Sequence, residues 1–264
     1  MKRSEAKCAV KIVRSEEDMI SAHGCDIDYE RVMDSFMYEI EIYSRIGTHP
    51  NVTQLLAIDD ELTVIVLERG DQDLQAFMNS RNGLPLSLRT CQEITIDILT
   101  AISFLHSHSI AHLDVKPCNI LLFRDSQTPR MTAKLCDFGI SRVLVDESKI
   151  FVNEEICSLW YRAPEVIMGQ VQCTSAVDEW SLGCVTLFLL LGDAPFKGSS
   201  KHVCRCITPS HVNYNDDQLR KIFKLVGTPS HSLLQNMECF CHFRSWNIFP
   251  SILASTVCAW KPFP

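Results

Sequence analysis

The sequence predicts an α+β fold. Two β-branched runs, at 7–13 and 63–68, favour strands. Between them, apolar residues recur at helical spacing from 29 to 46, which predicts an amphipathic helix. A later apolar stretch, at 185–191, is too short to span a bilayer and predicts a buried helix. With 264 residues, 46% hydrophobic and 22% charged, the chain can bury one substantial core or two unequal lobes.

The first strand run, KCAVKIV at 7–13, contains Lys11. Taken alone, a strand lysine is a solvated charge about nine times in ten. The helix at 29–46 has an apolar stripe that we expect to pack on a sheet. Its members are Met33, Phe36, Met37, Ile40 and Tyr43. Glu39 sits beside this stripe, whereas Glu41 lies further round the helix and fits an exposed position.

The second strand run, TVIVLE at 63–68, ends in RGDQDL, where Gly70 and the acidic residues break the strand. Further on, residues 110–122 read IAHLDVKPCNILL and residues 134–139 read KLCDFG. This spacing places Asp114 and Asp137 on either side of a short apolar hairpin.

The polar residues around this hairpin are those that phosphoryl transfer requires. Asp114 can accept a proton from an attacking hydroxyl, and Lys116 can neutralise the moving phosphoryl group. Asn119 and Asp137 offer oxygen ligands to the Mg²⁺ that masks the charge of ATP. A lone H-x-D would mean little, since a buried His and a capping Asp are common. The ordered set H-x-D-x-K-P-x-N followed by D-F-G is a strong signal.

On these motifs the chain resembles a eukaryotic protein kinase, from about Cys8 to about Ser230. The resemblance implies a two-lobed α+β fold with a truncated, β-rich small lobe and a mainly helical large lobe. It divides the domain, 1–264, into a partial small lobe at 1–67, a hinge at 68–73 and a C-terminally shortened large lobe at 74–264. It also implies ATP and Mg²⁺ as cofactors.

The resemblance also implies an ATP site. Lys11 would hold the α- and β-phosphates, and Glu39 would pair with Lys11. The carbonyl of Glu68 and backbone groups of Gly70 would meet the adenine edge. The remaining positions are Leu67 at the rear pocket, Asp73 at the ribose, and Ala9 and Leu121 on the two faces of the adenine. For these last two residues, ordinary core packing is an equally good explanation.

Three segments resemble the cyclin-dependent and related proline-directed kinases of the CMGC group. They are SLWYRAPE at 158–165, SAVDEWSLGCV at 175–185 and DQLRKIFKLVGTPS at 217–230. Lys116, in the loop that contains Asp114, looks like the lysine of serine/threonine protein kinases rather than of tyrosine kinases. Ser158 matches the hydroxyl that bonds to the catalytic Asp and Lys, and Arg162 matches an arginine associated with a pocket for proline after the phosphorylated residue. The implied substrate is a protein with Ser/Thr-Pro sites.

The chain departs from the family pattern before Lys11, where no G-x-G-x-x-G is present. The backbone amides of that loop normally cradle the phosphates. We therefore expect Lys11 to lie on an exposed edge strand, with weakened ATP binding.

The arginines that normally bind an activation-loop phosphate are also depleted. Leu113 replaces one, Tyr38 stands at the helix position of another, and Arg142 remains. Asn153, which cannot take phosphate, holds the position of the phosphorylated threonine. These losses agree with one another, because an arginine cluster without its phosphate would be unpaired like charge. We hypothesise that one of the two glutamates after Asn153 pairs with Arg142.

The tail after GTPS lacks the D-P-x-x-R segment that usually pairs with the APE glutamate, here Glu165. We expect a compensating arginine or solvent exposure, because a buried unpaired carboxylate is costly. The helix that would face a cyclin reads DSFMYEI at 34–40 in place of PSTAIRE, which weakens the case for a cyclin. Met33 and Met37 could still present an apolar surface to a cyclin or another activating subunit, although core packing explains them more simply.

Composition excludes several classes of protein. The net charge of −7 and a pI near 5.7 argue against a nucleic-acid binder. The start, MKRSEAK, shows no secretory signal and we expect no membrane contact.

Thirteen cysteines, an odd number, favour reduced thiols in the nucleus and/or cytoplasm. A Zn²⁺ site is disfavoured because its C-x-C spacing is too short. Its members would be Cys204, Cys206, Cys239, Cys241, His202, His211 and His242.

The sequence thus favours a serine/threonine protein kinase of the cyclin-dependent type, with a role in cell-cycle control suggested by resemblance alone. The main alternative is a pseudokinase or scaffold that keeps the kinase fold with weak or no phosphoryl transfer. The missing Gly-rich loop supports this alternative, and the intact Asp114, Asn119 and Asp137 oppose it. A small-molecule kinase is a third reading, weakened by WYRAPE.

Overall fold

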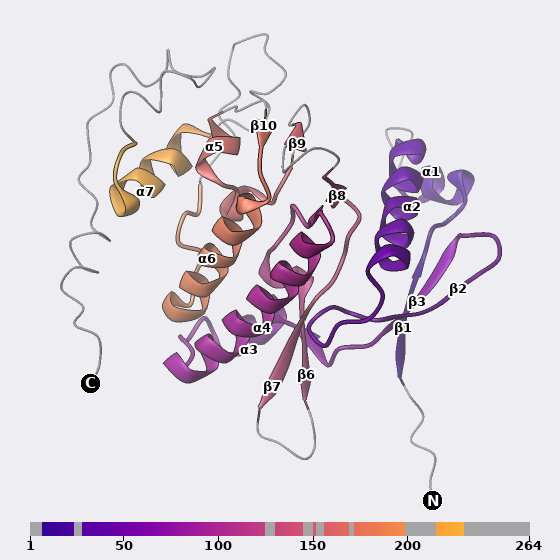
Figure 1. The fold of residues 1–264 in the computed structure, drawn as a ribbon, viewed down its shortest axis with the longest axis horizontal. Coiled ribbons are helices and arrows are strands. Elements are labelled where there is room, and N and C mark those ends of the chain that lie inside the picture. Colours follow the sequence, from indigo (N-terminus) through magenta and orange to yellow (C-terminus); the bar gives the residue numbers. More distant parts are fainter. Residues whose placement is uncertain are drawn as a thin grey trace, which may run out of the picture.

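The computed structural model describes residues 7–23, 28–124, 130–144, 150–151, 156–168, 172–198 and 215–229. A strand-rich part, with β1 to β3, α1 and α2, lies beside a helical part with α3 to α7 (Figure 1). The predicted α+β class is confirmed. The lobe boundaries at residues 67 and 73 stay predictions.

The strand-rich part is an antiparallel sheet in the order β1-β3-β2. Its strands are β1 (Cys8–Ile12), β2 (Leu55–Ile58) and β3 (Val64–Glu68). The register places Ala9 opposite Leu67 and Lys11 opposite Ile65. Every side chain of β1 is exposed, and among the described residues β1 pairs with β3 alone. Lys11 therefore lies on an exposed edge strand, as expected.

Helix α2 (Tyr29–Ile46) follows the short α1 (Glu16–His23) and begins where the Asp28 side chain accepts the Arg31 N–H. Its residues Phe36 and Ile40 pack with Ile65 of the sheet. The predicted span is correct, but the predicted stripe is partly wrong. Met37 is 39% exposed and Met33 is half-buried, whereas Ile42 and Ile46 are buried. The buried face is rotated because it includes Glu39, which faces Lys11.

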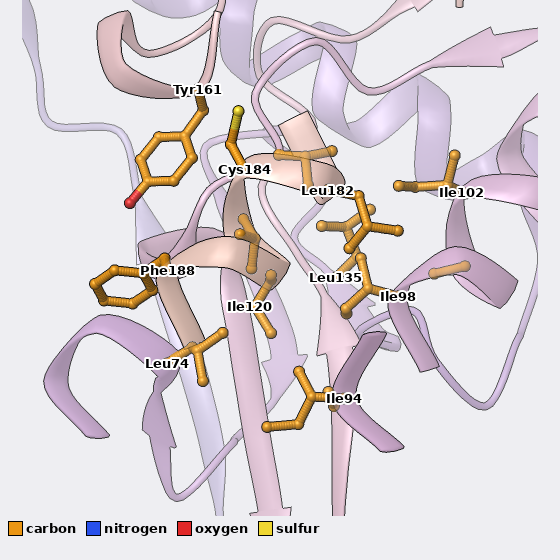
Figure 2. Close-up of a cluster of buried hydrophobic side chains, with 14 of the residues drawn as sticks. Leu74, Ile94, Ile98, Ile102, Ile120, Leu135, Tyr161, Leu182, Cys184 and Phe188 are labelled. Atoms are coloured by element: carbon orange, nitrogen blue, oxygen red, sulfur yellow. The ribbon is translucent and has the colours of Figure 1, made fainter. Parts of the chain in front are cut away.

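The helical part is built around α4 and α6. Its helices are α3 (Leu74–Ser80), α4 (Leu88–Ser107), α5 (Pro164–Ile167), α6 (Ala176–Leu191) and α7 (Asp216–Val226). Side chains of Ile94, Ile98, Leu182 and Phe188 meet in its core (Figure 2). The predicted buried helix at 185–191 is the end of α6, whose last residue, Leu191, is 58% exposed. In the described ranges, no helix is long and apolar enough to cross a bilayer.

The predicted apolar hairpin is present as β6 (Ile120–Arg124) paired with β7 (Met131–Leu135). The chain also forms shorter strand pairs: β4 (Gln72–Asp73) with β6, β5 (Ile110–Ala111) with β8 (Arg142–Val143), and β9 (Ile150–Phe151) with β10 (Gln172–Cys173). The backbone of Leu135 also exchanges hydrogen bonds with Asn51 and Thr53, at 2.8 and 2.9 Å. These bonds fix the segment between α2 and β2 to the strand that leads into Asp137.

The buried carboxylate of Asp178, in α6, fixes the turn before Asp114. It accepts the backbone N–H groups of His112 and Leu113, each at 2.8 Å, and lies 2.9 Å from Nε2 of His106. Leu113 needs this support because its φ of +66° is in the left-handed region, which a leucine rarely adopts. Both N–H groups would otherwise be buried without a partner.

Glu165, at the first turn of α5, is half-buried. Among the residues that the structure describes, none forms an ion pair with it. Burial raises the pKa of its carboxyl. The expected compensating arginine is thus not found in the described part of the chain, and partial exposure is the observed outcome.

Asp178→Asn should lower the stability of the fold by about 1–3 kcal/mol, because the amide keeps one acceptor oxygen and turns N–H groups toward buried donors. Thermal or urea unfolding would measure this. The neighbouring Glu179→Gln, at an exposed position, is the control. Equal midpoints for the two variants would contradict this account of the turn.

Glu165→Gln should raise the unfolding midpoint at about pH 7.5 and change it little at about pH 4. The folded protein binds this proton more tightly than the unfolded chain does. The stability due to Glu165 is therefore lost as the pH rises from its unfolded pKa through its folded pKa. The exposed Glu61→Gln serves as control. A midpoint that falls at neutral pH would show that Glu165 has a stabilising partner.

Candidate active site

Asp114 is the centre of a hydrogen-bonded cluster. Its Oδ1 accepts the Ser158 N–H and hydroxyl at 3.1 and 2.8 Å, and its Oδ2 lies 2.7 Å from Lys116 Nζ. Lys116 also donates to Ser158 Oγ at 3.0 Å. Both contacts expected of Ser158 are therefore present. The cluster joins the turn at 112–114 (the catalytic turn) to Ser158, the first residue of SLWYRAPE.

The His112 ring links the backbone on both sides of this site. Its Nδ1 accepts the Asp114 N–H at 3.2 Å, so Nε2 carries the proton and donates to the Cys136 carbonyl at 3.1 Å. The ring also contacts Phe138 edge-on, with centroids 5.3 Å apart, and Phe138 in turn meets Tyr43 of α2 at 5.0 Å. Ring contacts thus run from α2 to the catalytic turn.

Asn119 and Asp137 fit a hard divalent cation. The Asn119 Nδ2 donates to the Asp114 carbonyl and Oδ2 at 3.0 and 3.1 Å, which leaves the amide oxygen as an acceptor. Asp137 supplies carboxylate oxygens, and these are ligands that Mg²⁺ prefers. Burial opposes its charge, but Lys11, His112 and the Gly139 N–H together outweigh burial and the pKa of Asp137 is lowered. The donor set is therefore anionic and suited to Mg²⁺.

Lys11 lies between two carboxylates. Its Nζ is 2.5 Å from Glu39 Oε2 and 3.3 Å from Asp137 Oδ1. Burial alone lowers the pKa of Lys11, but the two carboxylates outweigh it and the pKa is raised. Burial raises the pKa of Glu39, and Lys11 offsets only part of that shift. Glu41 pairs instead with Arg45 at 2.6 Å on the exposed side of α2, so the choice of Glu39 over Glu41 is correct.

The expected adenine site surrounds the hinge. A Cβ on Gly70 would lie 2.9 Å from Leu121 Cβ, so the hinge backbone rests directly on β6. Ala9 lies in register with Leu67 on the exposed β1, so core packing does not explain Ala9. The Asp73 carboxylate begins α3 by accepting the Ala76 N–H at 2.7 Å, a role that the sequence did not predict. Its contact with a ribose stays a prediction.

The Glu68 side chain ties the hinge to both parts of the fold. It accepts two hydrogen bonds from Lys134 of β7, at 2.7 and 2.8 Å, and one from the Gln54 N–H at 2.8 Å. The side chains of Lys134 and Glu68 are both largely shielded from solvent, at 18% and 20% exposed. The side chain of Glu68 is thus occupied, and the contact of its carbonyl with the adenine edge stays a prediction.

Leu113 is fully buried where the family has an arginine. It belongs to an apolar cluster that includes Ile156 and Cys157. Arg142 lies over the Tyr38 ring at 5.3 Å. These contacts join the catalytic turn, α2 and the segment before Ser158 without a phosphate. Asn153 and the two glutamates after it lie outside the described residues, so their pairing with Arg142 stays a hypothesis.

Arg162 is buried and fixes the backbone beside Ser158. Its guanidinium donates to the carbonyls of Ile156 at 2.9 Å and Cys157 at 2.8 Å. Cys157 has a φ of +56°, so this backbone is held in an unusual conformation. Its relation to a proline pocket stays a prediction.

The sequence reasoning missed three residues of the site, namely Ser35, His112 and Asp178. Two of them stand inside motifs quoted for other reasons, HLD and SAVDEWS. Ser35 bonds to the Gly139 carbonyl at 2.9 Å and gave no signal, because a serine on a helix surface is ordinary. The seven Cys and His residues weighed as a Zn²⁺ site lie outside the described residues. Among the described residues, no three His, Cys, Asp or Glu side chains are grouped so that they could hold a metal ion.

The chain is similar to known protein kinases over most of its length. The protein kinase domain family matches residues 1–244. Cyclin-dependent kinase B2-1 of Arabidopsis thaliana is 29% identical over 269 residues, which covers 98% of this chain and 77% of that protein. Cell division control protein 2 homolog 3 of Trypanosoma brucei brucei is 33% identical over 202 residues, 76% of this chain and 58% of that protein.

Among solved structures, the yeast RNA Pol II CTD kinase CTDK-1 complex contains a chain that superposes with a TM-score of 0.71. The match covers 97% of this chain and 75% of that chain at 24% identity, which shows the fold. The chain therefore belongs to the protein kinase family and resembles its cyclin-dependent members, with the two-lobed kinase fold.

Proposed function

We propose that the protein transfers the γ-phosphoryl group of ATP to serine or threonine on proteins. The observation that carries this proposal is the joint placement of Asp114, Lys116, Asn119 and Asp137 with the Lys11–Glu39 pair. When bound, Mg²⁺-ATP supplies the phosphoryl group and its activation. The chain supplies orientation, charge and a proton acceptor.

In this proposal, the substrate hydroxyl donates to Asp114 in place of Ser158 and loses its proton there. Lys116, already 2.7 Å from that carboxylate, balances the charge that develops. Lys11 is oriented by Glu39 toward the phosphates. Each group is positioned by bonds that already exist in the fold, so little reorganisation is needed.

A preference for proline after the phosphorylated residue is supported by the buried Arg162. Arg162 donates to the carbonyls of Ile156 and Cys157, directly before Ser158, where we expect the substrate peptide to bind. These backbone acceptors are therefore occupied. A substrate residue with an N–H would find those acceptors taken, whereas proline has no N–H to satisfy. Resemblance to the relatives named for the cell cycle supports a role there, in the nucleus and/or cytoplasm.

An activating subunit such as a cyclin is also proposed, from the names of relatives and from α2. This helix exposes Met37 and Tyr38. The scaffold alternative is supported by Lys11, whose side chain is 45% exposed on an edge strand. Solvent around the Lys11 ammonium group would weaken its electrostatic attraction to phosphate. The experiments below separate the alternatives.

Asp114→Asn should reduce transfer of labelled γ-phosphate to a Ser-Pro peptide by about 100-fold or more, because the proton acceptor is lost. A Ser-Ala peptide tests the proline preference. Asp60→Asn, in an exposed turn, is the control. ATP binding without transfer by the unmodified chain would favour the scaffold; equal rates for both peptides would end the proline proposal.

Glu39→Gln should lower kcat/KM for ATP by about 10- to 100-fold, because Lys11 loses a charge-assisted hydrogen bond. Glu41→Gln, two residues along the same helix, should change it by less than about twofold, since its pair with Arg45 is exposed. Steady-state kinetics with varied ATP would measure both. Similar losses in the two variants would mean that the helix, rather than the ion pair, was perturbed.

A further inference from the structure

Gly139, the glycine of DFG, connects α2 to the Asp137 carboxylate. Its carbonyl accepts the Ser35 hydroxyl at 2.9 Å. A Cβ on Gly139 would lie 2.5 Å from Ser35 Oγ and 3.5 Å from Asp137 Oδ1. A side chain at position 139 would therefore force Ser35 to move, and Ser35 is in direct contact with a residue two positions after Asp137.

The contact belongs to a series along one face of α2. Ser35, Glu39 and Tyr43 are four residues apart, so they occupy successive turns on the same side of the helix. Tyr43 contacts Phe138, and Glu39 reaches Asp137 through Lys11. Ser35 completes the series at Gly139. Three turns of α2 thus contact the three residues of DFG, directly or through one lysine.

A serine within a helix ordinarily donates its hydroxyl to a backbone carbonyl of the same helix. Ser44 of the same helix shows that behaviour, donating to the Ile40 carbonyl at 2.8 Å. Ser35 instead bonds to a residue 104 positions away. Such a bond restrains a distant segment and contributes little to the helix itself.

Restraint at Gly139 matters for Asp137 because the two residues interact directly. Asp137 has a φ of +68°, a conformation that a non-glycine residue holds only when its neighbours fix it. Burial raises the pKa of Asp137, whereas Lys11, His112 and the Gly139 N–H lower it, so the pKa is low on balance. Fixing the carbonyl of Gly139 also limits rotation of the backbone that carries its N–H.

We propose that Ser35 is a positioning residue, which holds Gly139 so that the Asp137 carboxylate is oriented for a divalent cation. The proposal rests on the proposed function, since it assigns Asp137 to that cation. It predicts that loss of the Ser35 hydroxyl makes the DFG backbone more mobile and raises the Mg²⁺ concentration that phosphoryl transfer requires.

The first test is hydrogen exchange of the full chain without nucleotide or metal. In Ser35→Ala, the amides of Gly139 and Ser141 should exchange about 3- to 10-fold faster, the loss expected for one hydrogen bond. Ser35→Thr, which keeps the hydroxyl, should retain most of the protection. Ser44→Ala, which loses a hydroxyl on the same helix, should leave these amides unchanged.

The second test is the Mg²⁺ concentration that gives half-maximal phosphoryl transfer at saturating ATP. It should rise about 3- to 10-fold in Ser35→Ala, return in Ser35→Thr and stay constant in Ser44→Ala. Unchanged exchange in Ser35→Ala, or equal effects in Ser44→Ala, would overturn the proposal. If no variant transfers phosphate, the proposed function fails by itself, and the exchange comparison still decides whether Ser35 holds Gly139.

Discussion

The carboxylate of Asp178 fixes the catalytic turn, and the remaining geometry depends on that turn. By accepting the N–H groups of His112 and Leu113, it lets Leu113 keep a left-handed backbone in a fully buried place. His112 is then set to accept the Asp114 N–H and to donate to Cys136. A buried carboxylate is tolerable here because each oxygen is hydrogen-bonded. The position of the proposed proton acceptor thus follows from a residue of α6.

The site is an arrangement of charges that compensate one another. Lys11 is close to two carboxylates, and Lys116 is close to Asp114. Burial acts against the charges of Lys11, Glu39 and Asp137, and it prevails at Glu39, whose pKa is raised, but not at Asp137, whose pKa is lowered. Removing any one partner therefore leaves a charge less stabilised. Helix α2 and the DFG segment must be in contact for the set to exist.

Leu113 and Tyr38, which stand where the family pattern has arginines, make contacts of another kind. Leu113 packs with Ile156, and Tyr38 stacks with Arg142. An arginine at 113 would need a phosphate or carboxylate partner in this cluster, whereas a leucine needs none. The segment that leads to Ser158 is also held by Arg162 and by Asp114 itself. The described contacts therefore hold this segment through several side chains at once.

The sequence by itself determined the α+β class, the span of α2, the apolar hairpin and the set of reactive residues, because period and motif order are local properties of a chain. It also selected Glu39 over Glu41. It did not determine which side of α2 is buried, where Met37 was misassigned, nor the roles of Ser35 and Asp178. Those depend on contacts between residues 28 to 104 positions apart. Only the tertiary structure decides them, because a serine or an aspartate acquires its partner when distant segments pack together.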